Sequence, residues 1–168
     1  MEIVSRNRKA SDIRRRVQDT GGPPCTMFTH ARTIAKKPRD LKAAMDIVRA
    51  CKEIIAECQY DTKTGRKTTS LKFWAMENPN KGIMPRFEGI PAFVFEPWEF
   101  GDPYTKQTAI WGYFNSPIKT HTEKPPTVKF DKLKTKEIHP ELYGFYNRTE
   151  RRAITPQGFA KAFMEENK

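Results

Sequence analysis

The spacing of apolar residues in one segment restricts the fold of this chain more than any other feature of the sequence. In DLKAAMDIVRACKEIIAECQ, residues 40–59, apolar side chains recur at intervals of three and four, and the charged residues mostly fall between them. This period is that of an α-helix with one apolar face, which becomes stable by covering another element. We therefore expect a helix over 39–59 that packs on a sheet. Its apolar face consists of Leu41, Ala44, Met45, Val48, Cys51, Ile55 and Cys58.

Three runs with the composition of β-strands follow this helix. They are SLKFWAM (70–76), GIPAFVFEPW (89–98) and QTAIWGYFN (107–115), and the segments between them are rich in Asn, Pro, Gly and Asp, as turns require. Connections this short favour an antiparallel meander over parallel crossovers. CTMFTHARTIA (25–35) is predicted to form a strand as well, and TVKFDKL (127–133) to add one at an edge.

The two ends of the chain are predicted to differ in structure. Residues 1–24 are interpreted as a basic arm, because a cluster of arginines is followed there by Gly and Pro residues that end regular structure. Thr155 and Pro156 together predict a helix start, with a capping hydroxyl before a proline in the first turn. We expect an α+β fold in which residues 25–168 form a single domain. It has an antiparallel sheet of about four strands packed against a long amphipathic helix and a C-terminal helix, with a basic N-terminal arm.

The chain carries a formal net charge of +11, and this charge is unevenly distributed. Basic residues exceed acidic ones in the first and last parts of the sequence, whereas the middle is close to neutral and holds most of the aromatic residues. Uneven positive charge of this size is typical of proteins that bind a polyanion. It is also compatible with solubility alone or with an acidic protein partner.

The aromatic residues of the strand-like runs separate onto different faces, because side chains alternate across a strand. In the second run Ile90, Ala92 and Val94 share one face, which we expect to pack beneath a helix, and Phe93 and Phe95 share the other. A ring-bearing face beside cations is how several single-strand binders hold nucleic acid, with bases stacked on the rings at roughly 1–3 kcal/mol per base. Burial of these rings on both faces of the sheet is the alternative that the sequence leaves open.

The first run supplies the strongest single candidate for base stacking. Lys72 and Trp74 share its ring-bearing face, so that a cation lies beside an indole ring, and Phe73 and Ala75 are expected on the core face. The cations predicted to attract nucleic acid are Arg14, Arg15, Arg16, Arg66, Lys67, Lys72, Arg151 and Arg152. The rings predicted to stack on its bases are Trp74, Phe93, Phe95, Trp111 and Tyr113.

No catalytic signature is found in the sequence. His30, His121 and His139 lie in no HExxH or Cys/His pattern, and GxSxG, Walker and dinucleotide-binding motifs are absent. Glu137 and Glu141 flank His139 most closely, but that segment reads as a helix start or a loop rather than a metal site. We therefore predict a protein without enzymatic activity, cofactor or metal.

The predicted function is binding of nucleic acid, with single-stranded RNA or DNA preferred over duplex. One alternative is an oligomeric assembly protein, a virion-type structural subunit or a protein-interaction module that uses the same rings as interface anchors, in which case the chain forms a homo-oligomer. A metal-dependent nuclease is the third hypothesis. No run approaches the roughly 20 apolar residues of a membrane helix, and no apolar stretch follows the basic N-terminus. An intracellular location, cytoplasmic or nucleoid or nuclear, without secretion, is therefore expected.

Overall fold

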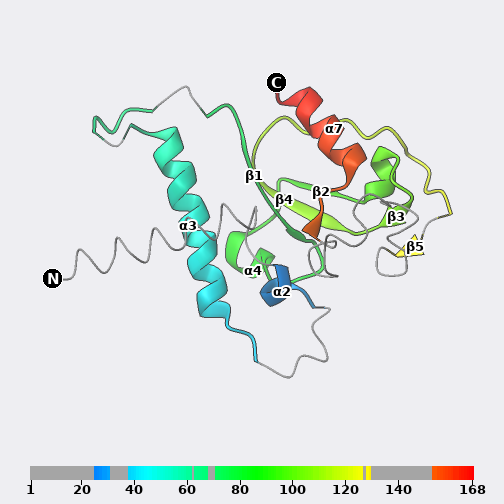
Figure 1. The fold of residues 1–168 in the computed structure, drawn as a ribbon, viewed down its shortest axis with the longest axis horizontal. Coiled ribbons are helices and arrows are strands. Elements are labelled where there is room, and N and C mark those ends of the chain that lie inside the picture. The colour runs from blue at the N-terminus through cyan, green and yellow to red at the C-terminus, as the bar shows by residue number, and fades with distance from the viewer. Residues whose placement is uncertain (1–24, 31–37, 62, 68–70, 127, 130–152) are drawn as a thin grey trace, which may run out of the picture. The chain divides into compact units, whose positions relative to one another are not determined.

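The computed structural model describes residues 25–30, 38–61, 63–67, 71–126, 128–129 and 153–168. The predicted basic arm, 1–24, lies outside the described residues. In chain order the elements are α2 (Cys25–Phe28), α3 (Leu41–Gln59), β1 (Trp74–Pro79), α4 (Pro85–Glu88), β2 (Phe93–Phe95), the 3-10 helix η1 (Pro97–Phe100), β3 (Tyr104–Thr105), β4 (Thr108–Tyr113), β5 (Val128–Lys129) and α7 (Gln157–Glu166) (Figure 1).

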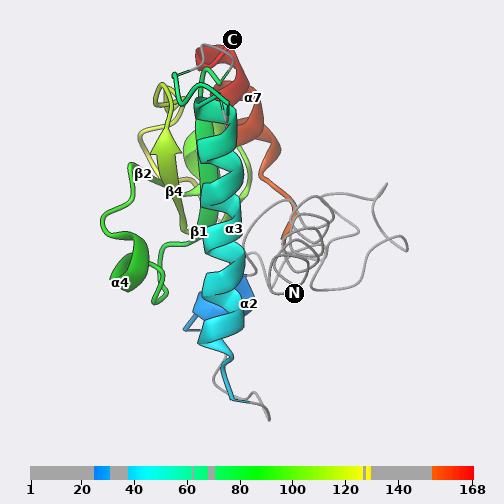
Figure 2. The same cartoon turned by 90° about the vertical axis from the view of Figure 1, so that its left-hand side faces the viewer.

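The long amphipathic helix predicted from the sequence is confirmed as α3. Asp40 caps its first turn, because the Asp40 side chain accepts a hydrogen bond of 2.9 Å from the backbone N–H of Ala43. Val48 and Cys51 on the predicted apolar face are buried, whereas Cys58 near the end of the helix is exposed. α2 contacts α3 and lies beside its first turns (Figure 2). The apolar face is therefore covered along the first part of the helix and open at its end.

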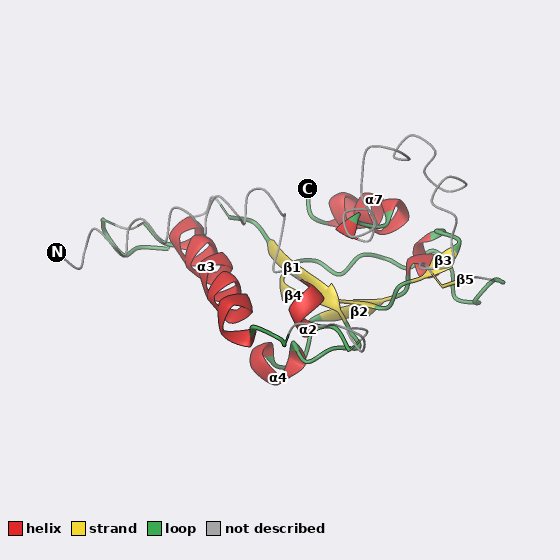
Figure 3. Ribbon diagram, turned by 60° about the horizontal axis from the view of Figure 1, so that its bottom comes forward, coloured by secondary structure: helices red, strands yellow, loops and turns green. Residues whose placement is uncertain are grey.

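The predicted α+β class is confirmed, with a three-stranded antiparallel sheet where about four strands were expected. Its order is β1-β4-β2, so β4 is the central strand (Figure 3). The meander predicted from connection lengths is wrong in this respect, because it would place β2 in the centre. Thr108, Ala109, Ile110 and Trp111 of β4 are all buried, and a strand apolar on both faces gains most from a central position.

A second, two-stranded sheet accounts for the strand predicted over 127–133. β3 and β5 pair in parallel there, with Tyr104 opposite Val128 and Thr105 opposite Lys129. The predicted segment therefore contains a strand, but it does not extend the main sheet. Residues 130–133 lie outside the described residues.

The strand predicted over 25–35 is wrong in its first part. Cys25–Phe28 forms a single helical turn, closed by a hydrogen bond of 2.9 Å from the N–H of Thr29 to the carbonyl of Cys25. This turn buries Phe28 completely, and the gain from burying its ring outweighs the weak local preference for a strand. Residues 31–35 lie outside the described residues.

The chain groups into two compact units that alternate along the sequence. The first takes in Met1–Ala92 and Ala109–Phe114, and the second takes in Phe93–Thr108 and Asn115–Lys168. The single domain expected over 25–168 stays a prediction. Each unit has its own buried residues.

The core of the second unit is a cluster of phenylalanine rings. Phe95 stacks on Phe159 of α7 with a centroid separation of 3.9 Å and an interplanar angle of 7°. Phe100 meets both rings edge-on, at 5.6 Å from Phe95 and 5.5 Å from Phe159. Phe163, one turn further along α7, lies 5.6 Å from Phe159. Burial of these rings holds α7 against η1 and β2.

Both ends of α7 are fixed by polar contacts with the rest of the second unit. At its start, Pro156 takes the cap position without a side-chain cap bond, and Asp102 accepts a hydrogen bond of 3.1 Å from the Gly158 N–H. The capping role predicted for Thr155 is therefore wrong, because a carboxylate from another segment takes it. At the end of α7, the Asn167 side chain accepts a hydrogen bond of 2.8 Å from the Asn115 N–H and donates one of 2.9 Å to the Asn115 carbonyl.

In the first unit the backbones of β1 and β4 come unusually close at Gly112. A Cβ atom placed on Gly112 would overlap the carbonyl oxygen of Trp74 and would lie 3.0 Å from the Cα atom of Ala75. Glycine is therefore required at this position by the absence of space, since backbone atoms cannot move aside as a flexible side chain would.

We expect Gly112→Ala to lower the free energy of unfolding by about 1–3 kcal/mol, because the added methyl group forces β1 and β4 apart. Urea unfolding followed by tryptophan fluorescence measures the change. Tyr113→Ala is the matched control, since the Tyr113 side chain is 71 % exposed. It should shift stability by less than about 0.5 kcal/mol. Equal stability of Gly112→Ala and the unaltered protein would contradict the close approach of the two strands.

Candidate nucleic-acid interface

Three of the predicted site residues lie close together where β1 begins and β4 ends. Tyr113 is 71 % exposed, Trp74 is half-buried and Lys72 is exposed. The contact between Gly112 and the Trp74 carbonyl brings the backbone of Tyr113 next to that of Trp74. We call Lys72, Trp74 and Tyr113 the strand end. All three belong to the first unit.

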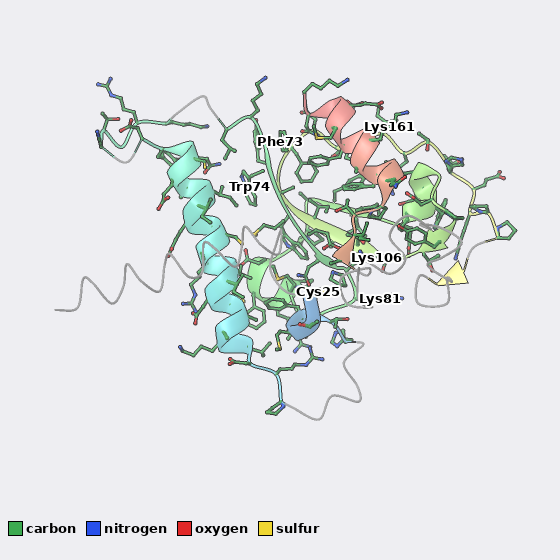
Figure 4. All side chains as sticks on the ribbon, in the orientation of Figure 1. Cys25, Phe73, Trp74, Lys81, Lys106 and Lys161 are labelled. Carbon is green, nitrogen blue, oxygen red and sulfur yellow. The ribbon has the colours of Figure 1, made fainter. Side chains whose placement is uncertain are left out.

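The side chains at the start of β1 alternate, but their burial is the reverse of the prediction. Met76 and Asn78, on the same face as Trp74, are buried, whereas Ala75 is exposed. The expected assignment of Ala75 to the core face is therefore wrong. Figure 4 shows Phe73 and Trp74 directed to opposite sides of the chain. Trp74 is the first residue of the strand, and its ring stays half-exposed because cover increases only from Met76 onward.

A compact basic turn follows α3 in the same unit. Tyr60 and Lys67 face each other in an isolated antiparallel bridge, and the N–H of Asp61 donates a hydrogen bond of 2.8 Å to the carbonyl of Arg66. Gly65 has φ of 66°, a left-handed conformation that few other residues adopt without strain. We call residues 60–61 and 63–67 the basic turn. Its aromatic and basic residues, Tyr60, Lys63, Arg66 and Lys67, are all exposed.

Asp61 is the acidic residue of the basic turn, and its carboxylate accepts hydrogen bonds from backbone N–H groups of the same turn. Its Oδ1 atom accepts hydrogen bonds of 2.7 Å from the Thr64 N–H and 2.9 Å from the Lys63 N–H. These two donors, with the Thr64 side chain, hold the pKa of the Asp61 carboxyl below its ordinary value of 3.8. The carboxylate is therefore ionised at neutral pH and holds the backbone of Lys63 and Thr64 in the turn.

The cations of the basic turn and of the strand end differ from those of α3 in their partners. On α3, Arg49 pairs with Asp46 at 3.0 Å and Lys52 pairs with Glu88 at 3.0 Å. Within the described part of the chain, no carboxylate forms an ion pair with Arg66, Lys67 or Lys72. These three side chains are exposed and their charge is available to an outside anion.

The basic turn and the strand end are also close in the chain. Lys72 is five positions after Lys67, which limits the distance between their Cα atoms to about 18 Å. Cations and rings therefore lie within reach of one extended ligand of a few units. The arrangement suits a flexible polyanion that carries flat groups.

Two of the predicted stacking residues are buried, and their prediction as exposed rings is wrong. Phe95 is 1 % exposed, because it is the centre of the ring cluster of the second unit. Trp111 is 4 % exposed, and its indole N–H donates a hydrogen bond of 2.9 Å to the Gly89 carbonyl. Neither ring presents a face on which a base could stack.

Phe93 is half-buried in the second unit, and a cation of its own chain already lies over its ring. The Lys119 ammonium group is 5.5 Å from the Phe93 centroid and pairs with the Glu99 carboxylate at 2.7 Å. Phe93 belongs to the second unit, whereas the strand end belongs to the first. The remaining predicted cations, Arg14, Arg15, Arg16, Arg151 and Arg152, lie outside the described residues.

The sequence reasoning did not include Tyr60, which the structure adds to the candidate interface. Tyr60 is 47 % exposed and stands opposite Lys67 in the bridge that closes the basic turn. The signal for it was present in the sequence, because Tyr60 directly follows the amphipathic helix and precedes the basic run DTKTGRK. Because Tyr60 lies after the last residue of the helix, its ring is not part of the buried apolar face.

In the described ranges no group of three or more His, Cys, Asp or Glu side chains is arranged to hold a metal ion. The candidates Glu137, His139 and Glu141 lie outside them. His30 and His121 are exposed, and His121 Nδ1 lies 2.9 Å from the Thr120 hydroxyl. None of the described helices combines the length and the apolar character needed to cross a bilayer.

Comparison of this chain with protein-family models, with curated proteins and with solved structures found no match in any of the three.

We expect the basic turn to open on acidification below pH 3.8, and not above it. The pKa of Asp61 is lowered in the folded chain, so its stabilising contribution is complete at neutral pH and is lost as the pH falls through that lowered value. Amide resonances of Lys63 and Thr64 in a ¹⁵N–¹H spectrum should therefore shift together with a midpoint below 3.8. Asp61→Asn should abolish this titration. A midpoint at or above 3.8 would contradict the two hydrogen bonds.

Proposed function

We propose that this protein binds single-stranded nucleic acid through the basic turn and the strand end of its first unit. Bases stack on Tyr113 and Trp74, and phosphates pair with Arg66, Lys67 and Lys72. The observation that carries the proposal is the 71 % exposure of Tyr113, whose backbone lies next to that of the half-buried Trp74, together with exposed cations that form no ion pair within the described residues. No cofactor or metal takes part in this binding.

The physical basis of the proposal is a division of labour between rings and cations. Stacking on an aromatic side chain contributes about 1–3 kcal/mol per base and tolerates any sequence, because every base has a π-face. Cations add affinity by releasing the counterions that surround the phosphates. A chain with a net charge of +11 attracts such a ligand from a distance before either contact forms.

The preference for single strands follows from the unequal exposure of the two rings. Tyr113 is 71 % exposed, whereas Trp74 is half-buried, so only part of its side chain is open to a ligand. A base stacks on either ring only after leaving its duplex stack, which costs a few kcal/mol. An unpaired strand avoids most of that cost. We place the protein inside the cell, in the cytoplasm or in a nucleoid or nucleus, where such strands occur.

We expect Tyr113→Ala to weaken binding to single-stranded oligonucleotides about 5- to 150-fold, the equivalent of one lost stacking contact. Duplex of the same sequence should lose much less. Fluorescence anisotropy with labelled RNA and DNA, each single- and double-stranded, measures both affinities. Ile90→Ala is the control, because Ile90 is 94 % exposed and belongs to the same unit. Equal losses on single strands and duplex would remove stacking from the mechanism.

We expect the double substitution Arg66→Ala and Lys67→Ala to reduce the salt dependence of single-strand binding. Each phosphate contact contributes about 0.7 to the slope of log K against log salt, so the slope should become shallower by about 1.4. The matched control is Lys42→Ala with Arg49→Ala, which removes the same charge from a pair of side chains already bonded to Asp46. An identical change in both double variants would mean that only net charge matters.

Assembly through exposed apolar side chains is the second candidate function. Phe87, in α4, is 45 % exposed, and Ile90, two residues after the end of α4, is 94 % exposed. Exposed apolar side chains close together are typical of protein interfaces. Size-exclusion chromatography with light scattering separates the two functions: a defined oligomer that does not bind oligonucleotides favours assembly. Loss of the probe in the presence of divalent cations would instead indicate a nuclease.

A further inference from the structure

The basic turn adjoins α3, and the strand end includes Tyr113 of β4. The short helix α4 contacts both α3 and β4. The basic turn directly follows α3, and Tyr113 is the last residue of β4. α4 belongs to the first unit, as do α3 and most of β4. Its contacts with each element involve neighbouring residues, Glu88 and Gly89.

The first contact joins α4 to α3. Lys52 Nζ lies 3.0 Å from Glu88 Oε2, and the Glu88 side chain is only 8 % exposed. A carboxylate removed from water to this degree depends strongly on its partner, because an unpaired buried charge is costly. Lys52 is in the second half of α3, the half that leads into Tyr60. This ion pair therefore fixes α4 relative to the helix that carries the basic turn.

The second contact joins α4 to β4. The Trp111 indole N–H donates a hydrogen bond of 2.9 Å to the Gly89 carbonyl, and Trp111 is 4 % exposed. Gly89 ends α4 with φ of 74°, and its own N–H bonds to the Pro85 carbonyl. This conformation directs its carbonyl toward the indole and favours glycine. Trp111 precedes Tyr113 by two residues, so the bond fixes β4 immediately before the exposed ring.

The third contact joins α4 to α2. The Phe87 ring meets the Phe28 ring edge-on, with centroids 6.3 Å apart and an interplanar angle of 67°. Phe28 is completely buried, and its carbonyl accepts a hydrogen bond of 2.8 Å from the Ile83 N–H. Three separate contacts therefore connect α4 and its cap to α3, β4 and α2, and we call α4 the brace.

We infer that α4 sets the spacing between the basic turn and the strand end, and that the site consequently selects single strands long enough to occupy both at once. The inference rests on the proposed function. A rigid spacing makes the second contact intramolecular once the first has formed, so affinity gains from ligand length. A loosened brace reduces this gain without removing any group that contacts the ligand. Short oligonucleotides, which reach only one part, do not gain from the brace.

Lys52→Met tests the inference, and Lys42→Met on the same helix is its matched control. It breaks the pair with Glu88 and keeps the alkyl chain, whereas Lys42→Met removes an equal charge from the pair that Lys42 makes with Asp46. Oligodeoxythymidylates of about 2, 8 and 12 nucleotides serve as probes: the shortest cannot span the roughly 18 Å between the basic turn and the strand end, and the two longer ones match the site sizes of known single-strand binders. Relative to Lys42→Met, Lys52→Met should bind the longest probe about 2- to 30-fold more weakly. Binding of the shortest probe should be the same in both variants.

Trp111→Phe gives a second test from the other side of the brace. It keeps an aromatic ring in the buried site but removes the N–H that bonds to Gly89, and it should reproduce the length-dependent loss of Lys52→Met. Thermal unfolding of each variant verifies that it is folded at the temperature of the binding assay. If Trp111→Phe does not fold, Lys52→Met decides alone, because its side chain is 54 % exposed.

The outcomes separate failure of the inference from failure of the proposed function. An equal loss on short and long probes, or no difference between Lys52→Met and Lys42→Met, overturns the role of α4. If Tyr113→Ala weakens binding in the same series, the proposed function stands despite that result. If neither Tyr113→Ala nor the Arg66 and Lys67 double variant changes the affinity for any probe, the proposed function fails and the inference fails with it.

Discussion

The hydrogen bond from the Trp111 indole to the Gly89 carbonyl is the interaction on which the rest of the first unit depends. Trp111 is 4 % exposed, and a buried donor without a partner costs more free energy than a made bond contributes. The bond connects the central strand of the sheet to the helix that Lys52 holds against α3. With β4 fixed there, Gly112 passes close to β1 and Tyr113 emerges at the surface.

The sequence predicts the parts of this fold that local patterns determine. The period of three and four residues in 39–59 gives α3, and a capping aspartate marks its start. The order of the strands in the sheet is not determined by a local pattern, because it depends on which strand is best buried in the centre of the complete sheet. Nothing local in the connections indicates that β4, and not β2, is central. The helical turn at Cys25–Phe28 likewise follows from burial of Phe28, a gain that appears only when the tertiary structure is formed.

Of the candidate site, the sequence predicts the exposed residues at turns and strand ends but not which rings within the strands are buried. Alternation along a strand separates its two faces but does not say which face is covered, and β4 is covered on both. Trp111 and Phe95 were therefore predicted as exposed rings and are core residues. Tyr113 is exposed as expected, because strand ends lie where cover stops. Arg66 and Lys67 are exposed because turns with a left-handed glycine lie at the surface.

The proposed interface combines two features that proteins rarely show together on one surface. Large rings are normally withdrawn from water, and surface cations are normally paired or scattered. Here Asp61 uses its charge on backbone N–H groups of its own turn, which leaves Arg66 and Lys67 available to an outside anion. Gly112 removes the side chain that would separate β1 from β4, which keeps Trp74 near Tyr113.

Photo-crosslinking gives the most direct evidence on whether rings and cations of the first unit hold one strand. A single-stranded RNA that carries 4-thiouridine would be irradiated with the protein, and the attachment points identified by mass spectrometry. The proposed interface predicts crosslinks at Tyr113 and Trp74, competed by unlabelled single strands and much less by duplex. Crosslinks confined to the second unit, or none above those of an unrelated basic protein, would contradict it.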